Sequence, residues 1–381
     1  MLVMSRWKRR VRGGLLGVLV LSGVALVAVK CAYGGGEPYP DVSTAPALGE
    51  DRLSCLIPLE LPPGNISASP DGRIFYNLHP FAEPDRFSDA FVFEWKDGKG
   101  VPFPSQELQA GLYGTLGMTV DRQNRLWLVR PEGIEDRDTR LVAIDLTTNA
   151  VVVDYAFPRG TAPFAQDLRV TPDGKYVILA DTGIFRFTPP ALIVFDVERR
   201  TARRVLEGHP SVSPQDWVIT AQGEPYKVFH GLVTFSVGVD GVAIDDRGKW
   251  LYYATMSHDA VYRVPLDRLT TAGASDADLA AAIERVGPKP LSDGIALGPG
   301  GLLITDVEHG GLMTLSEDGK LSTLVKSPKV IWADGVTATP EGDVLFTDSA
   351  IPSYIDQLLR PPAPERVKAT QHCVYKLDLP G

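Results

Sequence analysis

The sequence is poor in the residues that build metal clusters and disulfide frameworks. It contains three cysteines, Cys31, Cys55 and Cys373, and six histidines among 381 residues. There is no CxxC pair, and no His/Cys group has the spacing of a zinc site, which excludes a zinc-stabilised domain. Cys55 and Cys373 could pair if the chain folds in an oxidising compartment.

Several motifs of known enzyme classes are also missing. The chain has no Gly-rich phosphate loop, no GxSxG elbow and no HExxH motif. No local motif therefore indicates any of these three kinds of active site. Basic residues are not in excess, because 38 Lys and Arg stand against 47 Asp and Glu, for a net charge of −9. We therefore expect no nucleic-acid partner, since nucleic acid needs a basic face. An acidic body permits a cationic ligand or a divalent metal.

The first 36 residues resemble a targeting segment. Five cations precede an apolar run over residues 15–29, and these cations are Arg6, Lys8, Arg9, Arg10 and Arg12. This order is typical of a signal peptide or an uncleaved N-terminal membrane anchor. Residues 37–51 are expected to form a linker. We therefore predict a secreted or periplasmic body whose N-terminal segment engages the membrane or the secretion machinery.

One phrase recurs six times after the linker: a short apolar strand, a tight turn and a second apolar strand. The copies centre on Ile66, Met118, Leu168, Val242, Ile295 and Val336. Six residues after each centre stands Gly72, Asn124, Gly174, Gly248, Gly301 or Gly342. Glycine and asparagine are the residues that best tolerate a positive φ, so all six copies predict the same turn. Such self-similarity is typical of a repeat architecture.

Each copy is followed by a third strand, and five copies by a weaker fourth strand. The turn positions are 52, 50, 74, 53 and 41 residues apart, and a value near 50 fits one four-stranded antiparallel sheet with its loops. We predict an all-β, six-bladed β-propeller over residues 52–381, and we expect a monomer. The sixth copy lacks a fourth strand, so residues 54–61 are predicted to complete it and close the ring. Because this pairing is antiparallel, it places Cys55 opposite the end of the last strand and disfavours a disulfide with Cys373.

Three insertions depart from the basic blade. Residues 275–285 predict a helix with Ser275 as its N-cap. Residues 207–237 and the Pro-rich residues 350–370 fall on the face where the first strands begin, so both are candidate lids. Four side chains of the first lid could cap a ligand or simply pack on the ring, namely Trp217, Tyr226, Phe229 and His230.

Carboxylates recur where the first strands begin. The six entry positions carry Gly64, Leu116, Gln166, Asp240, Asp293 and Asp334. We predict that Gln166 and the three aspartates bind a ligand, and that the aspartates could hold Ca²⁺ or another divalent metal, which prefers oxygen donors. The alternative is that these aspartates only satisfy turn backbone, because a residue repeated at one blade position can be explained by the repeat itself.

Polar residues that break the repeat are the other candidates, and they are His79, Arg130, His258, Glu308 and His309. His258 and His309 follow the second strand in blades four and five, and either could act as a general acid or base. Arg130 and Glu308 occupy similar exit positions and are predicted to contact a ligand. The alternative for each histidine is an exposed loop residue without catalytic function.

Taken together, several phrases resemble the major royal jelly protein/Yellow family. They are Arg125-Leu-Trp-Leu-Val, Ala191-Leu-Ile-Val-Phe-Asp, Gly238-Val-Asp-Gly-Val-Ala-Ile, Leu251-Tyr-Tyr, Val261-Tyr-Arg-Val-Pro and Ser292-Asp-Gly-Ile-Ala. The resemblance implies a secreted six-bladed propeller with a small-ligand site in its channel. It also implies kinship with gluconolactonase-like propellers, which use a divalent metal, and with proteins associated with aromatic amines and dopachrome conversion.

Two departures from that family pattern concern the channel mouth. Arg130 follows Val129 where the family commonly has an aspartate, and Asn65 stands where a metal-binding acid is expected. We therefore expect a small-molecule-binding propeller, with a metal-assisted lactonase or an isomerase as the catalytic form of this hypothesis. The alternatives are a non-catalytic binding protein and a protein-interaction scaffold.

Overall fold

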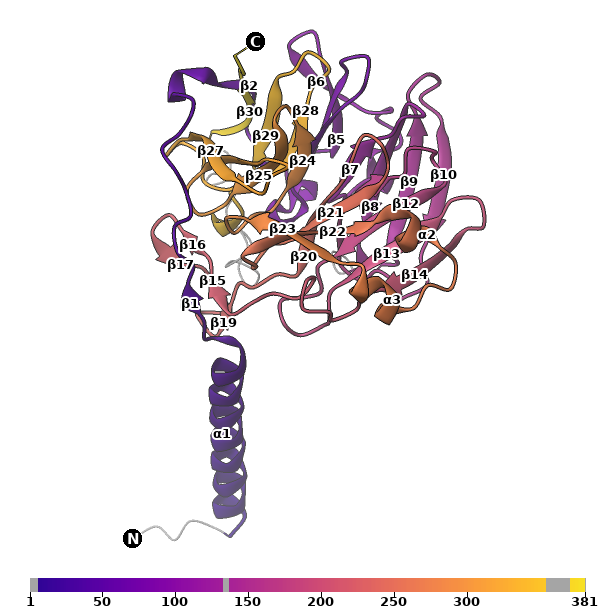
Figure 1. Ribbon diagram of the computed structural model, residues 1–381. Coiled ribbons are helices and arrows are strands. Elements are labelled where there is room, and N and C mark those ends of the chain that lie inside the picture. The colour runs from indigo at the N-terminus through magenta and orange to yellow at the C-terminus, as the bar shows by residue number, and fades with distance from the viewer. Residues whose placement is uncertain (1–5, 133–136, 354–370, 381) are drawn as a thin grey trace.

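The computed structural model describes residues 6–132, 137–353 and 371–380. These residues contain six four-stranded antiparallel sheets arranged as the blades of a propeller (Figure 1). Blades one to three comprise β3 (Pro63–Ala68), β4 (Ile74–Leu78), β5 (Val92–Lys96), β6 (Lys99–Pro102), β7 (Met118–Val120), β8 (Arg125–Arg130), β9 (Arg140–Asp145), β10 (Val151–Ala156), β11 (Ala165–Val170), β12 (Tyr176–Asp181), β13 (Ala191–Asp196) and β14 (Thr201–Val205). The predicted fold class is therefore confirmed.

The remaining blades follow the same order. They comprise β20 (Val239–Ile244), β21 (Trp250–Thr255), β22 (Ala260–Pro265), β23 (Glu284–Pro288), β24 (Ile295–Gly298), β25 (Gly301–Asp306), β26 (Gly311–Leu315), β27 (Leu321–Lys326), β28 (Ala333–Ala338), β29 (Val344–Asp348), β30 (His372–Leu377) and β2 (Leu53–Leu59). Apolar side chains from adjacent blades pack together into the core between the sheets. All six predicted turn residues have a positive φ, for example 73° at Gly174 and 58° at Asn124.

The N-terminal strand closes the ring as predicted. Strand β2 pairs antiparallel with β30, so blade six takes one strand from the start of the described body and three from its end. The expectation for the cysteines is wrong, because Cys55 and Cys373 form a disulfide with Cα atoms 5.5 Å apart. Cys55 lies opposite Tyr375, only two residues from Cys373, and the pairing is irregular between Cys55 and Ile57. This short offset makes the diagonal bridge possible.

The predicted helix over residues 275–285 is shorter than expected. Helix α3 (Asp276–Ala281) begins at the predicted N-cap, where the Ser275 hydroxyl accepts from the Asp278 amide. The chain then forms β23, because Glu284 and Arg285 pair with β22. Tertiary pairing thus overrides the helical pattern in the last residues. A further short helix, α2 (Leu266–Thr270), directly follows β22.

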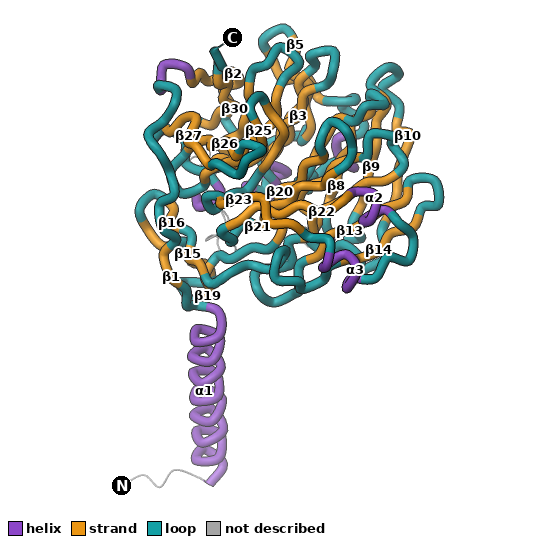
Figure 2. Tube along the Cα trace, in the orientation of Figure 1, coloured by secondary structure: helices purple, strands orange, loops and turns teal. Residues whose placement is uncertain are grey.

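The N-terminal segment forms helix α1 (Arg6–Tyr33), which projects from the propeller as a stalk (Figures 1 and 2). No helix in the described part of the chain combines the length and hydropathy that a membrane crossing needs. Apolar side chains of α1 such as Leu21 and Val27 are exposed. Strand β1 (Glu37–Pro38) then pairs in parallel with β15 (Trp217–Val218).

The disulfide should contribute measurably to stability, because it ties the two strands that close the ring and spans 318 residues of sequence. We expect the double variant Cys55→Ser/Cys373→Ser to lose about 2–5 kcal/mol of unfolding free energy. Denaturant unfolding measures this loss, and Cys31→Ser is the matched control. Three reactive thiols in the denatured, unreduced wild type, in place of the single Cys31 thiol, would contradict the bridge.

Candidate functional site in the central channel

The innermost strands of the six blades surround a cavity of about 20 Å³, which we call the acidic chamber. This volume corresponds to about one water molecule or one small cation. Its lining residues are Gly64, Asn65, His79, Leu116, Gln166, Asp167, Arg169, Asp240, Asp293, Gly294, Ile295, Asp334, Gly335 and Val336. The six residues at the predicted entry positions are all among them, so the structure brings Gln166 and the three predicted aspartates together.

Three aspartates in the chamber interact through their carboxyl groups. Burial raises the pKa of Asp240 well above its usual range, and the negative charges of Asp293 and Asp334 raise it further. Burial likewise raises the pKa of Asp334 well above its usual range. The pKa of Asp293 rises only to about 6, because hydrogen bonds from Trp332 and Asp240 partly offset burial. The raised pKa of Asp240 favours its protonated form, which can donate to Asp293.

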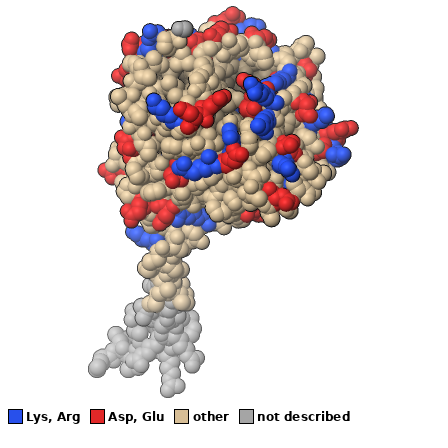
Figure 3. Space-filling model, viewed as in Figure 1, with Lys and Arg blue, Asp and Glu red and all other residues tan. Residues whose placement is uncertain are grey.

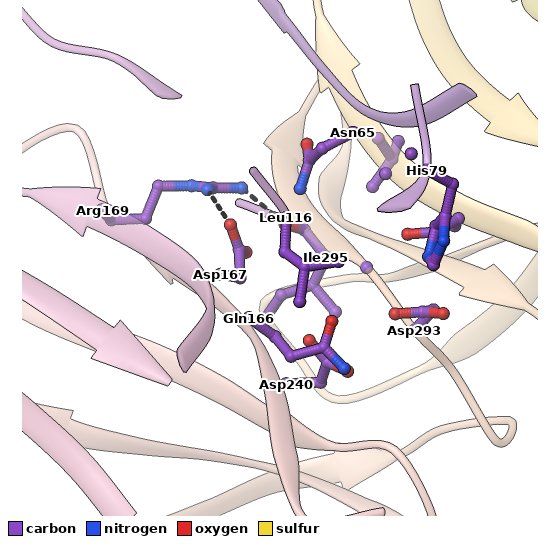
Figure 4. Close-up of a pocket in the computed structure, with 14 residues that line it drawn as sticks. Asn65, His79, Leu116, Gln166, Asp167, Arg169, Asp240, Asp293 and Ile295 are labelled. Atoms are coloured by element: carbon purple, nitrogen blue, oxygen red, sulfur yellow. Dashed lines mark hydrogen bonds and ion pairs between the residues drawn. The ribbon is translucent and has the colours of Figure 1, made fainter. Parts of the chain in front are cut away.

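Neighbouring donors hold the other acids in place. The indole Nε1 of Trp332 donates to Asp293 Oδ2 over 2.7 Å. A fourth aspartate, Asp167, accepts from Arg169 Nη1 over 2.8 Å, and burial raises its pKa although the guanidinium lowers it. Figure 4 shows the Asp167–Arg169 pair at one side of the chamber and His79 with Asp293 at the other.

His79 is a neutral imidazole that faces the chamber. Burial lowers its pKa to about 3. Its Nδ1 accepts from the Phe81 amide over 3.2 Å, so the ring proton resides on Nε2. That Nε2 lies 3.8 Å from Asp334 Oδ2. The histidine that can exchange hydrogen bonds with a channel ligand is thus His79, which the sequence marks only as a residue that breaks the repeat.

A lid of residues 207–237 covers the chamber on the side where the first strands begin. It contains β15, β16 (Thr220–Ala221), β17 (Glu224–Pro225), β18 (Lys227–Val228) and β19 (Val233–Thr234). Tyr226 and Phe235 of the lid pack against Trp332, with ring centroids 5.7 and 5.9 Å away. The aromatic residues of the lid therefore extend the hydrophobic core over Trp332, whose indole donates to Asp293. Most of the second predicted lid, residues 354–370, lies outside the described residues.

The N-terminal segment fastens this lid to the propeller. Thr234 Oγ1 donates to Gly35 O over 2.7 Å, and the Glu37 amide donates to Asp216 O over 2.9 Å. Tyr39 then contacts Trp217 edge to face, and its hydroxyl donates to Lys289 O of the propeller over 2.8 Å. The lid is consequently held by contacts from two directions.

The two histidines predicted as acid or base lie outside the lining of the acidic chamber. His258 Nδ1 accepts from the Ala260 amide over 3.2 Å, and its pKa falls to about 4, mainly through burial. His309 Nδ1 lies 2.9 Å from Asp306 Oδ2, which raises the pKa of the histidine. Each ring is thus engaged with its own loop, and His309 Nε2 also lies 3.6 Å from Asp41 Oδ2 of the N-terminal segment.

Arg130 and Glu308 also lie outside that lining. Arg130 donates to Asp138 O over 3.2 Å. Glu308 accepts from the Thr220 amide over 2.7 Å, and burial raises its pKa to about 7. Glu308 therefore anchors the lid strand β16 in this structure.

Asp167 and Arg169 belong to the chamber although sequence reasoning missed them. The position of Asp167 is held by Asn65 or glycine in the other five repeats, so the acid breaks the pattern. Comparing positions beside the entry residues could have found it. The sequence does not indicate a role for Trp332, because its contact with Asp293 depends on how blades five and six pack together.

The oxygen atoms that line the acidic chamber fit a bound divalent metal only in part. The carboxylate oxygens are suitable ligands for Ca²⁺, and Asp240 Oδ2 is buried without a hydrogen-bond partner. However, no three His, Cys, Asp or Glu side chains in the described ranges are grouped as metal ligands. A metal would therefore require these side chains to rearrange.

Comparison with known proteins agrees with this architecture. The family model described as major royal jelly protein matches residues 114–322, more than half of the chain. The chain belongs to the major royal jelly protein family. It is also similar to the Yellow-related salivary protein M10 of Phlebotomus duboscqi, with 28% identity over 169 residues. That match covers 38% of this chain and 40% of the relative, so the chain spans less than half of the relative's length.

Among solved structures, this royal jelly-family chain resembles a gluconolactonase from Xanthomonas campestris. The TM-score is 0.53 with 14% sequence identity, over 86% of this chain and 89% of the other. At this identity the likeness concerns the fold alone.

The aspartate cluster predicts a pH-dependent gain in stability for Asp240→Asn. The raised pKa means that the folded chain keeps a proton that the unfolded chain releases above about pH 4, so wild-type stability falls as pH rises. An asparagine avoids this loss and can still donate to Asp293. We expect the variant to gain about 1–3 kcal/mol at neutral pH and almost nothing near pH 4.

Urea unfolding at the two pH values measures this difference. Asp246→Asn is the matched control, because the Asp246 side chain is 95% exposed. An equal gain at both pH values would show that Asp240 is not held protonated by its neighbours.

Proposed function

We propose that this major royal jelly-family protein binds a small molecule in its central channel through the cluster of Asp240, Asp293 and Asp334. The observation that supports it is the burial of these three acids around one cavity. An ionised carboxylate costs several kcal/mol to bury unless it is compensated. Strongly perturbed acids inside a cleft are typical of functional sites.

The charge and size of the acidic chamber define the ligand. Carboxylates and a neutral His79 favour a cation or a group rich in hydrogen-bond donors, such as an amine. With the lid in place, the space of about 20 Å³ accommodates one small ion or water molecule. A larger ligand therefore requires displacement of Tyr226 and Phe235 from Trp332. Calcium or another divalent ion is the smallest candidate, and Asp240 Oδ2 favours it.

Catalysis is the second candidate for the same chamber. The pKa of about 6 places Asp293 near the operating range of a general base, and Asp240 can return the proton. This pair suits an isomerase that moves a proton, or hydrolysis of a lactone. The gluconolactonase fold supports lactones as the first substrates to screen.

We also propose that the protein acts outside the cytoplasm. The disulfide between Cys55 and Cys373 suits an oxidising compartment. The basic and then apolar N-terminal sequence suits engagement with the membrane or the secretion machinery. On the face shown in Figure 3, Lys and Arg are interspersed with Asp and Glu.

Thermal unfolding with Ca²⁺, Mn²⁺ or a small amine tests the binding proposal. A compound at about 100 times its Kd should add about 2.7 kcal/mol of stability to the wild type. We expect Asp293→Asn to remove most of that gain and Asp246→Asn to retain it. Stabilisation that survives in Asp293→Asn would place the ligand elsewhere.

A lactone hydrolysis screen with and without chelator then separates an enzyme from a binder. Hydrolysis lost in Asp293→Asn but kept in Asp246→Asn supports catalysis in the acidic chamber. Binding without turnover supports a non-catalytic binding protein. Neither binding nor turnover would favour a protein-interaction scaffold instead.

A further inference from the structure

The channel has a second chamber on the face opposite the lid. This open chamber has a volume of about 230 Å³, far larger than the acidic chamber. Its rim includes Arg122 and Asp246, which lie in the turns between the first and second strands of blades two and four. A molecule of about the size of a sugar acid can therefore enter it without any movement of the lid.

One ring of equivalent residues gives this chamber its chemistry. The residue after each repeat centre contributes to its lining, and these residues are Ser67, Thr119, Arg169, Ala243, Ala296 and Thr337. Five of the six are small, which leaves space. Arg169 is the charged member of this ring, and its side chain is 19% exposed.

Arg169 lies between the two chambers, because it lines both, as Val336 also does. Its Nη1 donates to Asp167 Oδ1 over 2.8 Å and to Leu168 O over 2.7 Å, while Nη2 donates to Ile295 O over 3.1 Å. A guanidinium has five N–H donors, so these three bonds hold the group in place and leave donors for a ligand. Asp167 thereby fixes the orientation of the arginine.

Hydroxyl groups lie around the same ring. Ser67 Oγ accepts from the Val120 amide over 3.0 Å, so its own proton can be donated. Thr119 and Thr337 add two further hydroxyls to the lining. Apolar side chains such as Val170 and Leu297 also line the chamber. Its remaining charged residues are paired, because Arg122 lies 3.7 Å from Asp246 and Asp121 lies 2.7 Å from Arg125. The chamber thus combines Arg169 in its ring with paired charges beside it and several neutral hydrogen-bonding groups.

We propose that the open chamber binds a small hydroxylated monocarboxylate, with the carboxylate on Arg169 and its hydroxyls on Ser67, Thr119 and Thr337. Guanidinium groups bind carboxylates through charge-assisted hydrogen bonds. A monoanion fits better than a dianion, since Asp167 already balances part of the positive charge. The proposal does not depend on the function of the acidic chamber.

Titration calorimetry with gluconate as the probe tests this site. We expect binding by the full-length protein with a Kd on the order of 1 mM, and no binding of the neutral polyol sorbitol. EDTA in all solutions removes any contribution from a divalent site. Equal binding of sorbitol, or no heat from gluconate at about ten times that concentration, would overturn the proposal.

Two arginine variants separate the chamber from the rest of the surface. Arg169→Gln should weaken gluconate binding at least about tenfold, because a charge-assisted contact is lost. Arg140→Gln is the matched control, since Arg140 pairs with Asp154 in the outer strands of blade two and lines neither chamber, and it should change the affinity by less than about twofold. Equal losses in both variants would indicate unspecific attraction and contradict the site.

A third variant keeps the test decisive if Arg169→Gln fails to fold. Thr337→Leu leaves the guanidinium in place but fills part of the open chamber and removes one hydroxyl. We expect gluconate binding to fall at least about tenfold while thermal unfolding stays cooperative. Undiminished binding by this folded variant would place the carboxylate outside the chamber.

Discussion

The close approach of the six innermost strands is the constraint on which the channel depends. A side chain at Gly294 would collide with the backbone carbonyl of Asp334, and one at Gly335 would lie 2.9 Å from Asn65 Cα. Glycine at these positions lets adjacent blades meet backbone to backbone. The residue just before each glycine, Asp293 or Asp334, is then carried to the same cavity.

Bringing several carboxyl groups into one buried cavity is electrostatically unfavourable, and neighbouring residues offset part of this cost. Burial and like charges raise the pKa of Asp240 well above its usual range, so Asp240 holds its proton more strongly than an exposed aspartate does. The Trp332 indole and the Arg169 guanidinium each stabilise one remaining carboxylate. The lid covers the acidic chamber on one side, and Arg169 lies between that chamber and the open chamber on the other side.

The repeated sequence pattern predicted the blades correctly, but it did not predict where individual side chains point. The turn residues and strand order follow from short-range preferences repeated six times, and the structure confirms them. His258 and His309 come where strands end, but each ring bonds within its own loop and lies away from the chamber. Cys55 and Cys373 were misjudged because the irregular pairing near Cys55 cannot be read from strand polarity.

The sequence by itself determined the repeat, the number of blades, the closing strand and the set of entry residues, because these depend on periodic positions and turn chemistry. Only the tertiary structure decided that Asp167, Arg169, His79 and Trp332 share the channel with the predicted aspartates. These contacts join residues from different blades, and their geometry is set by blade packing. The same packing divides the channel at Arg169, a feature that no single repeat encodes.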